Sequence, residues 1–301
     1  NGNNINYSWC NSCKLLRKNK LVAMFDLSTS TKIYLATILS KSLIFLFQRK
    51  NFVISRNGIK YRIDLEEGVD LGIFLGVKNE KKLFNIKKYI NQKQKFNIVD
   101  IGSNIGSVTL PLANTFKKSQ VYSIEPTVYA FEKLKENINL NPNLKKRIKT
   151  FNYFISKKKS KIKFVHSSWK LNSNDKKHGV HRGILKKTFN KSISLDDLLK
   201  KNKIPIKLIK IDVDGYELDV LKSAEKTLKK IKPIIYFELA PYLYKEIGYK
   251  FDDLLNYLKK LNYHFYNEDL KPVSNIKSIS LKLTNRSMNF FLIHDSFKKA
   301  L

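Results

Sequence analysis

The fold of this chain is decided by one segment, Asn97-Ile-Val-Asp100-Ile-Gly102-Ser-Asn104-Ile-Gly106. It starts as an apolar run, passes an acid and leads into a helical pattern. We expect Gly102 to let the chain turn sharply off a strand, and Gly106 to let the helix start approach a ligand closely. Because Asn104 stands in place of a glycine, the spacing is Gly-x-x-x-Gly and differs from the Gly-x-Gly-x-x-Gly of dinucleotide-binding folds.

From residue 96 onward, short apolar runs alternate with amphipathic segments. This alternation predicts right-handed βαβ units and a mostly parallel sheet covered by helices on both faces. Ligands of such sheets bind at the carboxyl ends of the strands. The expected strands are 97–101, 120–125, 148–155, 206–212, 234–238, 263–266 and 288–294, and the expected helices are 105–116, 128–140, 193–201, 216–228 and 251–261.

The chain divides into three expected parts: an extension over 1–50, a hairpin and helix over 51–95, and the main domain over 96–301. The hairpin is predicted by Asn57-Gly58 between two apolar runs, because both residues tolerate positive φ. The helix is predicted over 80–90, where apolar residues recur on one face.

The most apolar stretch, 33–47, is fifteen residues long and contains Lys41. That is short of the roughly twenty apolar residues of a membrane span. Its large side chains recur at helical spacing, so we expect a helix packed on the main domain, with peripheral membrane contact as the alternative. No small-residue cleavage site follows it, which argues against a signal peptide. The recurring residues are Tyr34, Leu35, Ile38, Leu39, Phe45 and Leu46, and the stripe is widened by Leu43, Ile44 and Phe47.

The formal net charge is +33, which invites a nucleic-acid partner. Arg, the residue that best reads phosphates, occurs only 7 times, whereas Lys, Asn and Ile are abundant. We therefore attribute most of the charge to composition bias. The two cysteines fit a reducing compartment, so we expect a cytoplasmic protein. Cys10 and Cys13 lack the second ligand pair that a zinc site needs.

The second expected strand ends at Glu125, twenty-five residues after Asp100. A carboxylate at the tip of the neighbouring strand can accept both hydroxyls of a ribose. Paired with the glycine turn, Glu125 is predicted to bind a nucleoside-type cofactor.

Five motifs together resemble the FkbM-type S-adenosylmethionine-dependent methyltransferases, over about residues 58–294. The resemblance implies a class I, Rossmann-like α/β fold with seven strands, the last antiparallel. It implies that S-adenosylmethionine is held by Asp100, Gly102, Asn104, Gly106 and Glu125, with residues 152–156, including Ser156, near the adenine. The motifs are Asp100-Ile-Gly-Ser-Asn-Ile-Gly106, Ser123-Ile-Glu-Pro126, Ser194-Leu-Asp-Asp-Leu198, Lys210-Ile-Asp-Val-Asp-Gly-Tyr-Glu217 and Phe237-Glu238.

Methyl transfer to a hydroxyl needs an aligned acceptor and a base for its proton. Asp212 is the first candidate for that base, or for the group that orients the acceptor, and Asp214 and Glu238 are next. Crowded carboxylates raise one another's pKa, and they could instead hold a divalent cation, although we assign no metal site. The alternative for Asp214 and Glu217 is that they cap the following helix.

The resemblance implies O-methylation of a sugar, glycan or glycolipid-like acceptor. An RNA methyltransferase, supported only by the charge, and a binding module without catalysis are the alternatives. The Asn/Asp-Pro-Pro-Tyr/Phe motif of adenine-N6 chemistry is absent. The polar segment 166–187 holds Trp169, His166, His178 and His181, and we expect a lid over the acceptor or a solvated insertion there. Trp169 could stack on a sugar face.

Overall fold

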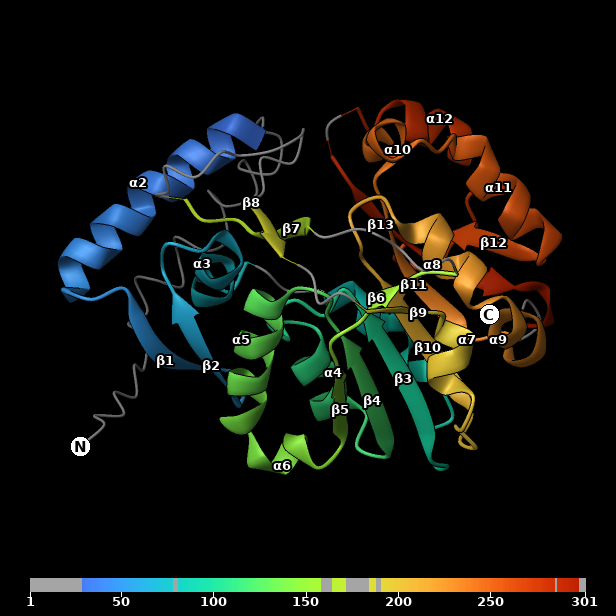
Figure 1. Ribbon diagram of the computed structural model, residues 1–301, viewed down its shortest axis with the longest axis horizontal. Coiled ribbons are helices and arrows are strands. Elements are labelled where there is room, and N and C mark those ends of the chain that lie inside the picture. Colours follow the sequence, from blue (N-terminus) through green and yellow to red (C-terminus); the bar gives the residue numbers. More distant parts are fainter. Residues whose placement is uncertain are drawn as a thin grey trace.

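The computed structural model describes residues 29–77, 81–157, 164–171, 184–187, 191–284 and 286–297. Cys10, Cys13, His178 and His181 lie outside these residues. Figure 1 shows a central sheet with helices on both sides, and a hairpin and a long helix at one edge.

The central sheet has seven strands in the order β12-β13-β11-β10-β3-β4-β5. Neighbours pair in parallel except around β13, which is antiparallel to both β11 and β12. This arrangement confirms the expected α/β class, the seven strands and the antiparallel last strand. The strands are β3 (Phe96–Ile101), β4 (Ser119–Ile124), β5 (Ile148–Phe151), β10 (Ile206–Ile211), β11 (Ile234–Leu239), β12 (Tyr263–Tyr266) and β13 (Met288–His294).

The strand order reverses between β3 and β10. From β3 the chain builds outward through β4 to β5, and then returns to β10 on the other side of β3. The connections that leave β3 and β10 therefore run in opposite directions, which opens a crevice at the carboxyl ends of these two strands.

Successive residues of the sheet belong to different apolar layers, as the period of two in a strand requires. Ile98 of β3 packs in one layer and Val99 in the other. The first layer is covered by α4 (Thr109–Thr115), α5 (Val128–Asn139) and α6 (Pro142–Lys145); the second is covered by α7 (Leu195–Leu199), α8 (Glu217–Ser223), α9 (Glu225–Ile231), α10 (Pro241–Ile247), α11 (Phe251–Lys260) and α12 (Ile276–Leu281).

Two expected helices are shorter or divided. The helix expected over 105–116 begins only at Thr109, because Asn104 and Gly106 have φ angles of 48° and 88° that no helix allows. The helix expected over 216–228 is split into α8 and α9. The Ser223 hydroxyl donates to the Val220 carbonyl at 2.7 Å and accepts from the Leu195 N–H, which competes with the helical ladder.

Other elements also differ from the sequence expectation. The strand expected over 148–155 is divided into β5 and β6 (Phe154–Ile155), and β6 leaves the sheet to pair with β9 (Ser192–Ile193). The segment 166–187 is not wholly irregular, since β7 (Phe164–Ser168) and β8 (Ile184–Lys187) form an antiparallel pair. The helix expected over 80–90 is the 3-10 helix η2 (Lys81–Tyr89).

The hairpin forms as expected, with β1 (Asn51–Arg56) and β2 (Ile59–Asp64) joined by Asn57 and Gly58 at φ angles of 51° and 75°. The second edge of β2 is bonded by asparagines of the main domain. Asn137 accepts from the Arg62 N–H at 2.8 Å, and Asn141 accepts from the Lys60 N–H at 2.9 Å. The hairpin packs in the same apolar layer as α5, and the division at residues 50 and 95 stays a prediction.

The apolar stretch near the start forms α2 (Thr29–Phe47), which begins four residues earlier than expected. The face that packs on the domain is not the recurring set named from the sequence. Its packed residues are Ile33, Ala36, Leu43, Ile44 and Phe47, whereas Tyr34, Leu35, Ile38, Leu39, Phe45 and Leu46 are exposed. Among the described residues, no helix has the length and hydropathy needed to cross a bilayer.

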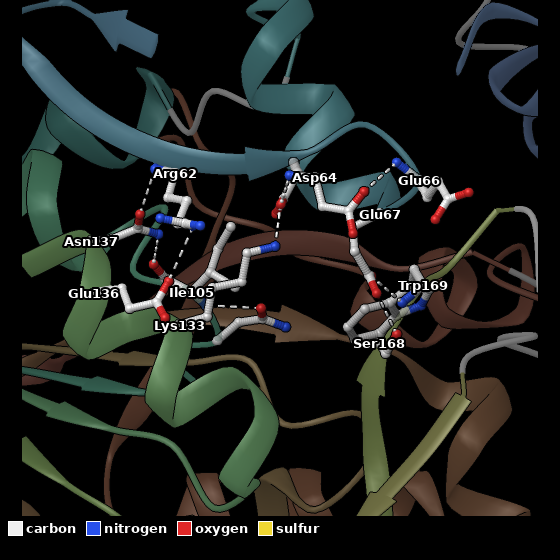
Figure 2. Close-up of polar contacts among 12 residues, drawn as sticks. Arg62, Asp64, Glu66, Glu67, Ile105, Lys133, Glu136, Asn137, Ser168 and Trp169 are labelled. Carbon is white, nitrogen blue, oxygen red and sulfur yellow. Dashed lines mark hydrogen bonds and ion pairs between the residues drawn. The ribbon is translucent and has the colours of Figure 1, made fainter. Parts of the chain in front are cut away.

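A buried ion pair fixes the position of α3 (Gly68–Leu75) on α5 (Figure 2). The Lys133 ammonium contacts Asp70 Oδ2, and both side chains are nearly inaccessible. The Asp64 N–H donates to the same oxygen at 2.6 Å. Burial raises the pKa of Asp70 to about 6, although the charge of Lys133 opposes the shift.

We predict that Lys133→Met lowers the free energy of unfolding by about 3–5 kcal/mol, because it leaves a buried carboxylate without its cation. The double variant Lys133→Met/Asp70→Asn removes the charge as well and should recover part of that loss. Urea denaturation of both variants measures the difference. A double variant that is less stable than the single one would contradict this role of the pair.

Candidate active site

A pocket of about 610 Å³ opens at the carboxyl ends of the central strands. That volume is within the range of small-molecule sites. Its wall combines the turn after β3, the end of β4, the loop after β10 and the end of β11. The lining includes Gly102, Asn104, Glu125, Tyr153, Phe154, Ile155, Trp169, Lys210, Asp212, Asp214 and Glu238.

Gly102 allows the turn after β3 to lie directly against the end of β10. Its φ is 77°, and a Cβ there would lie 1.8 Å from the Asp212 carbonyl oxygen. The Asp212 N–H donates to the Ile101 carbonyl at 3.2 Å. Any side chain at position 102 would therefore separate the two strand ends that form the pocket floor.

Gly106 has a different reason for being glycine from the one expected. It does not line the pocket. Its φ is 88°, and a Cβ there would lie 2.8 Å from Leu134 Cδ1 on α5. The glycine therefore permits close packing of the turn on α5.

Asp100 is fully buried beneath the turn and does not line the pocket. Its Oδ2 accepts from the Thr109 hydroxyl at 2.6 Å, and its Oδ1 lies 3.5 Å from the Lys210 ammonium. The structure thus places Asp100 as a support of the turn.

Glu125 is 5% exposed and lines the pocket from the tip of β4. Its Oε2 accepts from the Asn104 N–H at 2.9 Å. Its Oε1 accepts from both the N–H and the hydroxyl of Thr127, at 2.9 and 2.6 Å. Burial raises the pKa of Glu125, and these donors oppose the rise. The carboxylate is oriented toward the pocket, and further acceptor capacity remains on Oε2.

Residues 152–156 are only partly at the pocket. Tyr153, Phe154 and Ile155 line it, whereas Ser156 does not. The Ser156 N–H donates to the Ile193 carbonyl at 3.0 Å, which holds the segment against β9. The structure therefore offers the three residues before Ser156 as the apolar wall on this side.

The loops after β10 and β11 bring three carboxylates together. Asp212, Asp214 and Glu238 each offer an oxygen within 4.8 Å of the others. Asp214 has a φ of 49°, a left-handed conformation that Asp tolerates better than most residues. The Ser287 hydroxyl donates to Glu238 Oε1. The three acids named from the sequence thus meet at the pocket wall.

Lys210 was not singled out from the sequence, because a lysine inside a strand pattern is usually a solvated charge. Here it is 2% exposed and faces the pocket floor. Its ammonium donates to the Gly102 carbonyl at 3.0 Å and lies 3.1 Å from Asp212 Oδ2. One buried cation therefore joins the turn after β3 to the acid after β10.

Two glutamates, Glu238 of this cluster and the neighbouring Glu217, bind protons more tightly than usual. Burial raises the pKa of Glu238 well above its ordinary value, and the charge of Asp212 and a hydrogen bond with Asp212 raise it further. Burial raises the pKa of Glu217 to about 8, although the Gly215 N–H donates to its Oε1. Gly215 precedes the N-cap residue Tyr216, and α8 has no side-chain cap bond, so this bond fixes the turn before the helix and does not cap it as expected.

Trp169 lines the pocket, and its backbone is held by the buried Glu67 carboxylate, which we call the Glu67 hub (Figure 2). The sequence analysis did not identify Glu67. Glu67 is 5% exposed and accepts from the Ser168 hydroxyl at 2.7 Å and the Trp169 N–H at 3.1 Å. The Tyr129 hydroxyl donates to it at 2.9 Å. Glu67 thereby fixes the end of β7 to the start of α3 and to α5.

Comparisons with known proteins agree with this geometry. A family model described as the methyltransferase FkbM domain matches residues 100–265, more than half of the chain. Over 138 residues the chain is 30% identical to the hexuronic acid methyltransferase AglP of Haloferax volcanii, a match that covers 45% of this chain and 53% of that protein. The chain thus spans about half the length of this curated relative.

Solved structures give weaker similarity. The FkbM methyltransferase of Methylobacillus flagellatus KT is 18% identical, with 66% of this chain and 43% of that chain covered and a TM-score of 0.40. The human methyltransferase 10 domain containing protein is 14% identical, with 88% and 97% covered and a TM-score of 0.44. The strand order described above, rather than these scores, carries the fold assignment.

We predict that Glu217 makes stability fall as pH rises. Its contribution is complete below about pH 4.5, the ordinary pKa, and is lost by about pH 8, the folded value, because the folded state keeps the proton that the unfolded state releases. The slope is at most about 1.4 kcal/mol per pH unit. Urea denaturation from pH 5 to 8 should show a flatter profile for Glu217→Gln.

The control is Glu136→Gln, whose carboxyl is 57% exposed on α5. It should leave the pH profile of the parent protein intact. An unchanged slope in Glu217→Gln would show that the buried acid is ionised throughout this range.

Proposed function

The chain belongs to the FkbM methyltransferase family, and we propose that it transfers the methyl group of S-adenosylmethionine to a hydroxyl oxygen of a sugar in a glycan or glycolipid-like acceptor. The observation that carries the proposal is one pocket that is lined both by Glu125 and by the cluster of Asp212, Asp214 and Glu238. A hexuronic acid methyltransferase among the relatives supports a sugar acceptor.

The residues present fit the cofactor. S-adenosylmethionine supplies an electrophilic methyl group on a cationic sulfur. Glu125 offers an oriented carboxylate for ribose hydroxyls, and Gly102 lets the turn after β3 lie directly against Asp212 at the pocket wall. Asn104 presents the backbone that Glu125 fixes. The pocket's carboxylates also favour a bound cation over a neutral ligand.

Asp212 and Glu238 have different roles in proton transfer. Asp212 lies 3.1 Å from the Lys210 ammonium, which favours its ionised form and orients it. Glu238, with its raised pKa, holds a proton and donates a hydrogen bond to Asp212. Two neighbouring carboxyl groups kept in different protonation states are a common acid–base arrangement. Asp212 is thus the base for the acceptor hydroxyl, and Lys210 is a positioning residue.

Asp214 has a second role in the proposal. It follows Asp212 by two residues and lines the same pocket. Its left-handed backbone turns the chain toward Gly215, so its carboxylate lies beside the other two. We assign it to orienting the sugar by accepting a neighbouring hydroxyl.

The direct test is a methyl-transfer screen with purified protein, labelled S-adenosylmethionine and three acceptor classes: glycosides that carry a hexuronic acid, neutral glycosides, and RNA. Mass spectrometry of a methyl ether on a sugar hydroxyl is the expected result. Methylated RNA without any methylated glycoside would overturn the sugar acceptor in favour of the RNA alternative. Cofactor binding without turnover of any acceptor would favour a binding module.

We predict that Glu125→Ala weakens S-adenosylmethionine binding by about 2 kcal/mol, or about thirtyfold in Kd, because charge-assisted hydrogen bonds are lost. Isothermal titration calorimetry measures the change. Glu132→Ala is the control, since its carboxyl is 57% exposed on α5. A Kd equal to that of the parent protein would remove Glu125 from the cofactor site.

We predict that Asp212→Asn lowers the single-turnover rate by about 10²–10⁴ while cofactor affinity and melting temperature hold, because the amide keeps the shape but cannot take the proton. Asp269→Asn, whose carboxyl is 57% exposed, is the control. A smaller loss would indicate that Asp212 only orients the hydroxyl. Full activity with intact folding would transfer the role of base to Asp214 or Glu238.

A further inference from the structure

Helix α2 is apolar on both of its sides. One side packs into the hydrophobic core next to α3, through residues such as Ile33 and Phe47. The other side is exposed, and it holds six of the thirteen large hydrophobic side chains exposed in the described part of the chain. An apolar cluster of this kind on one helix marks an interaction surface. Its members, here called the outer face, are Tyr34, Leu35, Ile38, Leu39, Phe45 and Leu46.

The outer face has the charge pattern of an interfacial helix. At 100° per residue its six members cover an arc of about 140°. Lys32 and Lys41, both exposed, fall at the two margins of that arc. Lysines in this position extend their ammonium groups toward lipid headgroups while their stems lie along apolar surface.

The surrounding sequence is positively charged and contains no acid. No Asp or Glu occurs between residues 27 and 63. Arg49 and Lys50 follow the end of the helix, and Lys50 pairs with Glu66 at 2.9 Å. Basic residues next to an apolar helix face are attracted to the anionic leaflet of a bilayer. The charge of this edge is thus complementary to an anionic lipid surface.

The helix also belongs to the wall of the active-site pocket. Lys32, Ile33 and Ala36 line the pocket that contains Asp212 and Glu238. Figure 1 shows α2 along the outer edge of the molecule, beside α3 and on the side away from α11 and α12. The first turns of α2 thus lie between the outer face and the pocket.

From this placement we propose that the outer face of α2 docks the protein on an anionic bilayer surface, lying in its plane, and that the sugar acceptor is lipid-linked. The second half of the proposal rests on the proposed function; the first half does not. A bound bilayer lies next to the pocket wall, so a sugar attached to a lipid headgroup can enter without leaving the membrane. A second copy of the chain fits the face less well, because it would bring two acid-free, lysine-bordered surfaces together.

The first experiment measures insertion directly. Phe45→Trp and Leu281→Trp are matched reporters, since both parent side chains are 79% exposed, on α2 and α12. Each variant is mixed with phosphatidylcholine vesicles that contain 30% phosphatidylglycerol, with and without brominated acyl chains. We expect bromine quenching of at least half of the added fluorescence for Phe45→Trp and none for Leu281→Trp. Equal quenching of both, or of neither, would overturn the docking.

The second experiment separates insertion from general charge attraction. Sedimentation with the same vesicles should show about tenfold weaker binding for Phe45→Ser/Leu46→Ser, which keeps every charge, and parent-like binding for Leu281→Ser. Neutral vesicles should bind the parent protein at least tenfold more weakly. Equal binding of the Phe45→Ser/Leu46→Ser variant and the parent would reduce the contact to surface charge and overturn the role of the outer face.

Sedimentation velocity without lipid addresses the other occupants. A monomer supports the proposal. A dimer that Phe45→Ser/Leu46→Ser converts to a monomer, together with no vesicle binding by the parent, would assign the face to a second copy. A blue-shifted Phe45→Trp emission in the lipid-free monomer would show that the chain itself covers the face, which also overturns the proposal.

A turnover assay then tests the membrane docking and the lipid-linked acceptor separately. With a lipid-linked hexuronic acid in vesicles, Phe45→Ser/Leu46→Ser should lose at least tenfold in kcat/KM, whereas turnover of a water-soluble glycoside should hold. Equal turnover of both acceptors by parent and variant would overturn the lipid-linked acceptor alone. Vesicle binding without turnover of any sugar would leave the docking intact and contradict the proposed function.

Discussion

The pocket depends on the close contact between the turn after β3 and the end of β10. A Cβ at Gly102 would lie 1.8 Å from the Asp212 carbonyl, so the approach exists only because position 102 has no side chain. The approach places the turn after β3 and Asp212 on the same pocket floor. It also makes the first strand of the sheet and its neighbour across the order reversal act as one support, which is what a two-substrate pocket at this crevice requires.

The Lys210 ammonium pairs with acids gathered there. Lys210 is buried, donates to the Gly102 carbonyl and pairs with Asp212 and more distantly with Asp100. Without it, the carboxylates would repel one another and the turn would lose a donor. The Lys210 ammonium lies beside Asp212, whereas burial and the charge of Asp212 raise the pKa of Glu238. Lys210 lies near the end of β10 and Asp212 follows the strand by one residue. Because alternate residues along an extended chain share a face, their side chains lie next to each other.

The strand ends and the acids were predictable from the sequence because their signals are local. The glycine turn, the Asn57-Gly58 hairpin and the apolar runs of the sheet each depend on a few adjacent residues. The features that the sequence did not predict depend on residues distant in the chain. The late start of α4, the departure of β6 from the sheet and the Glu67 hub are set by contacts more than twenty residues apart, or by positive φ angles beside a motif. Periodicity alone could not select the packed side of α2, because both of its sides are apolar.

The charge distribution gives the final step. The chain carries 58 Lys and Arg against 25 Asp and Glu, yet three of those acids lie together in the pocket. Charges beyond about 10 Å are screened in physiological salt, so the surface lysines and the pocket acids act over different ranges. In the proposed reaction, the positive surface suits an anionic bilayer or an anionic sugar. Inside the pocket the nearby carboxylates dominate and favour a cationic sulfur beside a hydroxyl. A basic surface and an acidic pocket are therefore not in conflict: each suits one of the two substrates that the proposed reaction must bring together.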